Sequence, residues 1–433
     1  IAINLTMQRR GLPVAYLMTA GNQAQTGLSE MAIAMVEDER VSALGLHIEG
    51  FDSVAGFERL AVRARELNKP VVAMKAGRSE QARAATLSHT ASLAGSDAAA
   101  DAFLRRLGIA RVHSIPSFLE TLKLLHAGGP LSGFRLSSMS CSGGEASVMA
   151  DAAEGRRVMF PALLEEHRAR VRAALGPLVA IANPLDYHTF IWNDEPAMTA
   201  AFTAMVSGGF ELNLLVLDFP RADRCSDADW WPTVNAFEAA LVANAARGAV
   251  VASMPENLPE AYCERLLARG IAPLAGIAEA LDAAEAAATL GQSWARPAPV
   301  PVATAGAVAS GRSRMLDEAE AKALLSARGL LVPAGRRVCG IEEAAAAASG
   351  IGFPVALKAL GLAHKSEHGA VRLGLLDETA VRGAARGLLP LGTGLHVERM
   401  VEGGVAELIV GITRDELFGP VMTVGMGGVL VEL

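Results

Sequence analysis

The chain has 433 residues, of which 51% are hydrophobic and 20% are charged, so it can bury a sizeable core and is not intrinsically disordered. Lys and Arg total 39 against 46 Asp and Glu, a net charge of −7 that argues against nucleic acid or an anionic membrane as partner. No apolar run approaches the roughly 18–20 residues of a transmembrane helix, and the four cysteines form no CxxC pair, which indicates a reduced, cytoplasmic protein.

The first part of the chain alternates short apolar runs with helical patterns. Buried strands that alternate with helices are typical of a parallel α/β sheet. The predicted strands are 13–19, 43–49 and 70–75, and the predicted helices between them are 28–38 and 56–68.

A second α/β unit begins near Leu131, with strands predicted at 135–139, 212–218 and 249–254 and an Ala-rich helix at 277–290. Residues 296–313 are rich in Pro, Ala and Gly and predict a linker. The last part is richer in strands and reads as α+β. Its predicted elements are a helix at 317–328 and strands at 352–359, 371–375, 396–400 and 407–412.

A polar cluster follows the strand predicted at 70–75. His89 lies in a loop of small residues, and Ser96 or Asp97 can cap the next helix. An accessible imidazole near an electropositive helix N-terminus suits phosphate chemistry. The alternative is a surface loop with an ordinary N-cap.

Two further features lie at predicted strand ends. Glu49 ends the strand at 43–49, where a carboxylate can orient an imidazole, or can simply be solvated. Ser142, Gly143 and Gly144 lie between a strand and a helix. Such a turn forms a cradle of backbone N–H groups for an anion, or serves only to reverse the chain.

The last part carries Lys358 at the end of a strand, where an ammonium group can hold phosphates. Further candidate site residues in this part are Glu398, Met400, Val401 and Glu407. They precede a glycine loop at 425–428. Each charge taken alone also fits a solvated surface. The loop matches neither a Walker A nor a GxGxxG motif.

Together these segments resemble the NDP-forming acyl-CoA synthetases, the family of ADP-forming acetate–CoA ligase and succinyl-CoA synthetase. The resemblance is carried by KAGRSEQARAATLSHTASLAGSD at 75–97, LHIEG at 46–50, SCSGGEASVMAD at 140–151, and the segments at 356–375 and 397–433. It implies two flavodoxin-like parallel-sheet domains, at 1–128 and 129–295, followed by the linker at 296–313 and an incomplete α+β ATP-grasp domain at 314–433.

The resemblance also implies roles for individual residues. His89 is the residue that becomes phosphorylated and Glu49 contacts it, while Ser96 and the turn at 142–144 belong to the phosphate cradle. Lys358 contacts ATP phosphates, and Glu398, Met400, Val401 and Glu407 contact the nucleotide. Glu432 is a candidate Mg²⁺ ligand. Gly21 and Asn22 match a turn near the acyl and CoA end of the site.

The implied reaction joins a small carboxylic acid to CoA, with ATP and Mg²⁺, through an acyl phosphate and a phosphohistidine. A rival reading is a catalytically silent module of a protein acetyltransferase that senses acyl-CoA or nucleotide. Tyr187 and Trp192 lie in an aromatic segment that either packs a core or lines an acyl pocket. Such a pocket suits an aryl acid or an onium acid such as dimethylsulfoniopropionate, held by cation–π contact.

The ends of the chain also carry an expectation. The chain begins at Ile1 without Met and stops at Leu433 in what reads as an unfinished strand. We therefore expect a piece cut inside a domain at both ends, inactive by itself, from an enzyme that is complete only at full length. Family members are often dimers or heterotetramers, so homo-oligomers belong among the expected partners.

Overall fold

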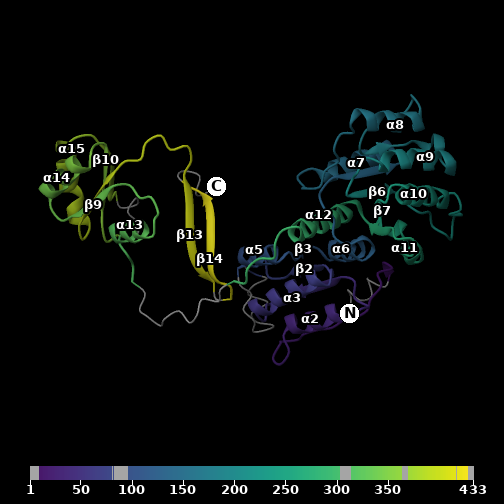
Figure 1. Cartoon of the computed structure of the whole chain (residues 1–433), viewed down its shortest axis with the longest axis horizontal. Coiled ribbons are helices and arrows are strands. Elements are labelled where there is room, and N and C mark those ends of the chain that lie inside the picture. The colour runs from purple at the N-terminus through teal and green to yellow at the C-terminus, as the bar shows by residue number, and fades with distance from the viewer. Residues whose placement is uncertain are drawn as a thin grey trace. The chain divides into compact units, whose positions relative to one another are not determined.

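The computed structural model describes residues 9–79, 81, 96–302, 314–362, 369–415 and 417–427. The chain forms two compact units: the first comprises Ile1–Thr304 and Thr413–Val421, and the second comprises Ala305–Ile412 and Met422–Leu433 (Figure 1). Two predicted site residues, His89 and Glu432, lie outside the described residues. The predicted domain boundaries remain predictions.

The first sheet is parallel, with the strand order β1-β2-β3. Its strands are β1 (Leu44–Ile48), β2 (Val71–Lys75) and β3 (Ala110–Arg111). Its helices are α2 (Leu28–Glu37), α3 (Val54–Glu66), α5 (Asp97–Leu107) and α6 (Ile115–Gly128). Side chains alternate along β2, so Val71 and Ala73 pack with α2, α3 and α5, whereas Val72 packs with α6.

The strand predicted at 13–19 is wrong. These residues form neither helix nor strand, and β1 is an edge of the sheet among the described residues. The Tyr16 hydroxyl donates to the Asp38 carboxylate, and the Arg40 guanidinium lies 5.0 Å from the centre of the Tyr16 ring. These contacts hold the segment to the end of α2, so its apolar pattern does not pair with β1.

The second sheet is also parallel, with the strand order β5-β4-β6-β7-β8. Its strands are β4 (Leu136–Ser140), β5 (Leu185–Asp186), β6 (Leu212–Val216), β7 (Gly248–Ala252) and β8 (Ala272–Ala275). Its α-helices are α7 (Gly143–Ala153), α8 (Glu165–Leu175), α9 (Glu195–Val206), α10 (Trp231–Ala243), α11 (Glu260–Leu267) and α12 (Ile277–Trp294), with short 3₁₀ turns at η1 (Thr189–Ile191) and η2 (Pro255–Asn257). Helices α7 and α12 cover one face, and α8 to α11 pack on the other.

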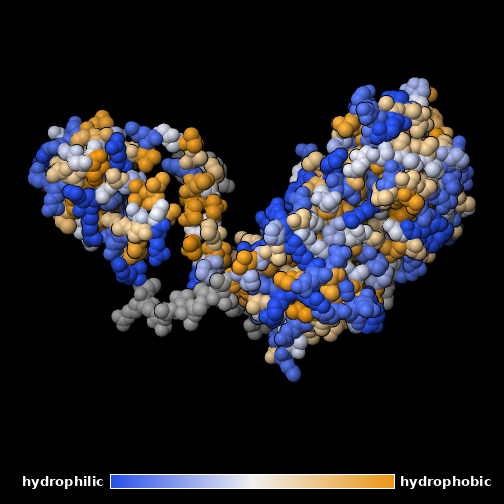
Figure 2. All heavy atoms as spheres, in the orientation of Figure 1, coloured by the Kyte–Doolittle hydropathy of each residue, from blue (hydrophilic) through white to orange (hydrophobic). Residues whose placement is uncertain are grey.

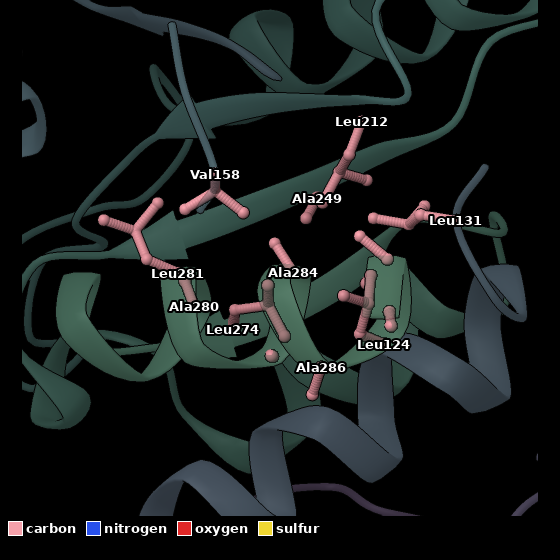
Figure 3. Packing of buried hydrophobic residues seen from close by; sticks show 14 of the residues in the cluster. Leu124, Leu131, Val158, Leu212, Ala249, Leu274, Ala280, Leu281, Ala284 and Ala286 are labelled. Atoms are coloured by element: carbon pink, nitrogen blue, oxygen red, sulfur yellow. The ribbon is translucent and has the colours of Figure 1, made fainter. Parts of the chain in front are cut away.

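One continuous core joins the two sheets. It runs from Val72 of β2 through Leu124 of α6 and Ala284 of α12 to Leu212 of β6. Figure 3 shows alanines of α12 facing larger side chains, among them Leu274. The small alanine side chains let helix and sheet approach closely, so apolar area leaves water without voids.

A buried ion pair lies at the same junction. Glu120 and Lys123 of α6 both have fully buried side chains, and their charged groups are 2.8 Å apart. Glu120 also pairs with Arg10 and accepts a hydrogen bond from the backbone N of Ala275, the last residue of β8, at 2.9 Å. The Glu120 carboxylate therefore ties α6, β8 and the N-terminal segment together.

The second unit contains an antiparallel sheet with the strand order β11-β10-β12-β9. Its strands are β9 (Gly335–Val338), β10 (Val355–Ala359), β11 (Val371–Leu375) and β12 (Leu395–Arg399). Its helices are α13 (Glu318–Ala327), α14 (Ile341–Ile351) and α15 (Glu378–Leu388), with a 3₁₀ turn at η3 (Leu389–Leu391). Helices α14 and α15 pack on the face that carries Val355, Leu357 and Val397. The opposite face carries the charged residues described below.

A hairpin of β13 (Leu408–Asp415) and β14 (Gly419–Met426) follows. Its strands expose apolar side chains such as Val410 and Val424. Figure 2 shows hydrophobic residues along this hairpin. Its turn, at Thr413–Val421, belongs to the first unit. There Phe418 lies 5.4 Å from Phe51 and 5.2 Å from Phe103, measured between ring centres.

Replacing Phe418 by alanine is expected to lower the free energy of unfolding of the first unit by about 2–3 kcal/mol, because a buried ring leaves a cavity. The loss is smaller than for a ring in the centre of a core, since Phe418 is 8% exposed. All four tryptophans lie in the first unit, so urea unfolding followed by their fluorescence reports this change. Val424→Ala, on the exposed part of the hairpin, is the control and should change stability by less than about 0.5 kcal/mol.

Within the described part of the chain, the helices are too short or too polar to span a lipid bilayer.

Candidate active site

The carboxyl edge of the first sheet brings Glu49 and Lys75 together. The Lys75 ammonium donates to the backbone oxygens of Glu49, at 3.2 Å, and of Ala76, at 2.6 Å. Burial lowers the pKa of Lys75, and the nearby Asp97 carboxylate partly opposes this shift. Lys75 thus ties the ends of β1 and β2 beside Glu49. The sequence analysis did not single out Lys75, although a lysine that ends an apolar strand marks this edge.

Ser96 begins the helix that follows the His89 segment. Its hydroxyl accepts a hydrogen bond from the backbone N of Ala99 at 3.1 Å, which confirms the predicted N-cap. Its own backbone N donates to the Asp415 carboxylate at 3.2 Å. The hydroxyl therefore serves the helix, and its role in holding phosphate remains a prediction.

A pocket of about 980 Å³ lies along β1, and Gly21, Asn22 and Glu49 all line it. The structure thus brings together the turn predicted near the acyl and CoA end and the predicted partner of His89. Gln23 fixes this turn: its side-chain amide donates to the backbone oxygen of Gly50 at 3.2 Å, and its side-chain oxygen accepts from the backbone N of Leu28 at 3.0 Å. Gln23 was missed because no motif marks a residue whose role is to join two loops.

The turn after β4 forms the predicted start of a helix. Ser142 is the N-cap of α7, and its side chain makes no capping hydrogen bond to the helix. Backbone N–H groups in the first turn of a helix have no intrahelical partner and favour an anion. A Cβ atom on Gly143 would lie 3.2 Å from the Asp186 carboxylate, so glycine permits this close approach.

Acidic groups surround the same turn. Burial raises the pKa of Glu145, in the first turn of α7, and the Asp218 and Asp186 carboxylates raise it further. A raised pKa favours the neutral acid, which reduces the repulsion that a bound anion would meet.

Within the aromatic segment, Tyr187 lies in the second sheet's core and Trp192 packs against it. Tyr187 is 1% exposed and lies edge-to-face against Phe202 at 5.0 Å, and burial raises its pKa. Trp192 lies edge-to-face against Trp230 at 5.6 Å. Neither Tyr187 nor Trp192 lines the pocket along β1. Their role near the acyl group remains a prediction.

In the second unit, Lys358 and Glu398 are in direct contact. Their charged atoms are 2.8 Å apart, and Lys358 also lies 2.5 Å from Glu318 of α13. Burial alone would lower the pKa of Lys358, but the two carboxylates outweigh it and raise that pKa. The two predicted nucleotide ligands therefore lie on one face of the sheet.

Lys322 of α13 completes this cluster by pairing with both Glu318 and Glu398. Sequence analysis missed Glu318 and Lys322. Their spacing of four residues on a predicted helix indicates a surface ion pair and no more, because a sequence does not show which strand lies beneath the helix.

The other predicted nucleotide residues lie apart from these ion pairs. The backbone N of Met400 donates to the backbone oxygen of Pro354 at 3.0 Å, and Val401 is exposed. The backbone oxygen of Glu407 accepts from the backbone N of Gly427 at 2.8 Å. Among the described residues, no group of three or more His, Cys, Asp and Glu side chains is placed to hold a metal ion.

Comparison with known protein families identifies two domains. Residues 1–125 match the succinyl-CoA ligase-like flavodoxin domain, and residues 307–433 match an ATP-grasp domain. The chain is 27% identical to trans-feruloyl-CoA synthase FCS1 of an unknown prokaryotic organism, covering 98% of this chain and 61% of the relative. It is 28% identical to ADP-forming acetate–CoA ligase I of Archaeoglobus fulgidus, covering 98% of this chain and 63% of that relative.

A solved structure shares the fold. It is the dinucleotide-forming acetyl-coenzyme A synthetase 1 of Ca. Korarchaeum cryptofilum in complex with phosphate and ADP, with a TM-score of 0.55 and 18% identity. The similarity covers 66% of this chain and 61% of that one. The chain therefore spans about three fifths of the length of these relatives. The chain thus carries both domains and is similar over 98% of its length to curated ADP-forming CoA ligases.

Proposed function

We propose that the protein ligates a small carboxylic acid to CoA at the expense of ATP, giving acyl-CoA, ADP and phosphate. The observation that carries this proposal is the Lys358–Glu398 pair on a sheet face of the ATP-grasp domain, in a chain that also has a phosphate-type turn at α7. Lysine on a strand and an uncapped helix start are two separate places for phosphoryl oxygens. A transfer enzyme needs both.

The proposed reaction passes the phosphoryl group through His89. CoA thiolate attacks an acyl phosphate, whose phosphate leaves. That acyl phosphate forms in two transfers. The His89 imidazole, which is nucleophilic near neutral pH, takes the γ-phosphoryl group of ATP and ADP leaves; the carboxylate of the acid then takes the phosphoryl group from His89, which frees the imidazole. Glu49 would accept a hydrogen bond from the other ring nitrogen, and Lys75 would hold the Glu49 loop in place. Helix N-termini stabilise the transferred charge without reorganising.

In the proposed reaction, Mg²⁺ would bind together with ATP, on the phosphates of the nucleotide. Glu432, the predicted protein ligand, lies outside the described residues. The complex of the Korarchaeum relative contains phosphate and ADP, which supports ATP as the phosphoryl donor here.

An aryl acid is the substrate class we favour. One relative is named for feruloyl-CoA, an aryl acyl thioester. An onium acid would need an aromatic ring whose face is free to bind its cation. Trp231, at the start of α10, does not offer one, because the Arg265 guanidinium already lies 3.3 Å from the centre of its ring. Comparing ligation rates for ferulate, acetate and an onium acid would identify the class, and equal rates would exclude an aromatic pocket.

Phosphohistidine formation is tested with γ-labelled ATP and Mg²⁺ on the protein expressed from its complete open reading frame. We expect acid-labile, base-stable protein-bound label that disappears in His89→Asn and discharges when ADP is added. His167→Asn is the matched control and should label normally, because the His167 ring of α8 contacts the backbone oxygen of Ala204 and the Phe210 ring, away from the proposed site.

Absence of label in folded protein would overturn the ligase mechanism. It would favour the rival reading, a module that senses acyl-CoA or nucleotide without turnover. Binding of ADP or CoA by such a silent protein would then identify which ligand it senses.

A further inference from the structure

Four charged groups in the second unit alternate in sign around a closed ring. Lys358 contacts Glu318 and Glu398, and Lys322 contacts the same two carboxylates. Two residues come from α13 and two from the sheet. The charges of these four groups, two ammonium and two carboxylate, cancel one another.

The ring is embedded in protein. The side chain of Glu398 is 6% exposed, and that of Lys358 is 19% exposed. A carboxylate this deeply buried is costly unless it is paired, and removing one partner leaves it uncompensated. Lys322 and Lys358 together keep the pKa of Glu398 below its usual range, although burial acts in the opposite direction.

His396 also faces Glu398: its Nε2 lies 3.8 Å from the Glu398 carboxylate, which is beyond hydrogen-bond distance. It lies opposite Lys358 in the ladder of β10 and β12, and its side chain is 4% exposed. Neither ring nitrogen has a hydrogen-bond partner among the described residues. Burial lowers the pKa of His396, which favours the neutral ring. Lys322 and Lys358, which contact Glu398 directly, are therefore its nearest cationic partners among the described residues.

This arrangement has a consequence for any ligand that takes Lys358. When the Lys358 ammonium turns to a phosphate, Glu398 loses one of its two cations. Lys322 remains on Glu398 through its own contact. Without Lys322, the movement of Lys358 to a phosphate would leave the buried Glu398 carboxylate without a contacting lysine.

We propose that Lys322 is a positioning residue of the nucleotide site: it neutralises Glu398 so that Lys358 can be released to a nucleotide phosphate. Glu318 has the opposite effect on nucleotide affinity, because its ion pair with Lys358 competes with the phosphate for the Lys358 ammonium. The proposal rests on the proposed function, in which Lys358 binds the nucleotide. Under this proposal, helix α13 affects the affinity for the nucleotide through Lys322, without itself contacting the nucleotide.

The test measures the Kd of Mg·ADP by titration calorimetry in the protein from the complete open reading frame. Lys322→Met leaves the ring one charge more negative and ties Lys358 to two carboxylates, so we expect binding about three- to tenfold weaker. Lys322→Arg keeps the charge and should bind within about twofold of the parent. Glu318→Gln added to Lys322→Met removes the excess negative charge and should restore most of the affinity.

A matched control separates this effect from the loss of any helix ion pair. Arg382 of α15 pairs with Glu378 four residues earlier, and also with Glu342. Arg382→Met should leave the Kd unchanged. Normal far-UV circular dichroism in every variant excludes misfolding as the cause.

The outcomes are distinct. Equal affinity in Lys322→Met and the parent would overturn the role of Lys322. Failure of Glu318→Gln to restore affinity would assign Lys322 a merely structural role and would equally overturn the proposal. No binding of Mg·ADP by the folded parent and the Arg382→Met control would overturn the proposed function itself, and this inference with it.

Discussion

Replacing Glu120 by alanine is expected to lower the free energy of unfolding of the first unit by about 3–5 kcal/mol. The Glu120 and Lys123 side chains are both 0% exposed, so the substitution leaves an ammonium group buried without its carboxylate. The backbone N of Ala275 also loses its acceptor. Urea unfolding followed by tryptophan fluorescence measures the loss.

The control for this prediction removes both charges. Glu120→Leu combined with Lys123→Met replaces the pair by apolar groups of similar size, so it should cost less than Glu120→Ala alone. A single substitution that costs under about 1 kcal/mol would contradict the idea that α6, β8 and the N-terminal segment depend on this carboxylate.

Replacing Gly291 by alanine is expected to destabilise the first unit by about 3 kcal/mol or more. A Cβ atom on Gly291 would lie 1.9 Å from the backbone oxygen of Leu131, so α12 would have to move away. That movement would also strain the hydrogen bond from the backbone N of Leu131 to the backbone oxygen of Ala287, now 3.1 Å long. The gain in helix propensity, about 1 kcal/mol, is too small to compensate.

Gly383 supplies the comparison. It lies within α15, and a Cβ there would meet no heavy atom within 4 Å. Gly383→Ala should therefore stabilise the second unit by up to about 1 kcal/mol, which thermal unfolding followed by circular dichroism would detect. If Gly291→Ala were equally harmless, α12 would not be packed against Leu131 as closely as the structure indicates.

The strands that could be predicted lie in short runs that stand apart from helical patterns, even where serines interrupt the apolar residues, as in β4. β1, β2, β4, β6 and β7 each lie within or overlap a predicted run. β8 was missed because it is four residues long and contains Pro273, which argues against a strand unless it lies at an edge, as β8 does. Residues 13–19 carried the right pattern, but contacts of Tyr16 decide their conformation, and a pattern of hydrophobicity does not contain them.

The site was predictable only in part, for a related reason. Lys358 and Glu398 were each expected near a nucleotide because they lie in family segments, and they prove to be a contacting pair. Lys75, Gln23 and Lys322 act through residues far away in the sequence, and no local spacing marks them. The position of His89 relative to Glu49 stays a prediction.

The core that runs from β2 through α6 and α12 to β6 also limits how this protein can move. The Glu49 loop follows β1 of the first sheet and the start of α7 follows β4 of the second, so a hinge between the two sheets would have to expose this shared core to water. We therefore expect the two sheets to move as one body, so that groups attached to each of them keep a fixed separation.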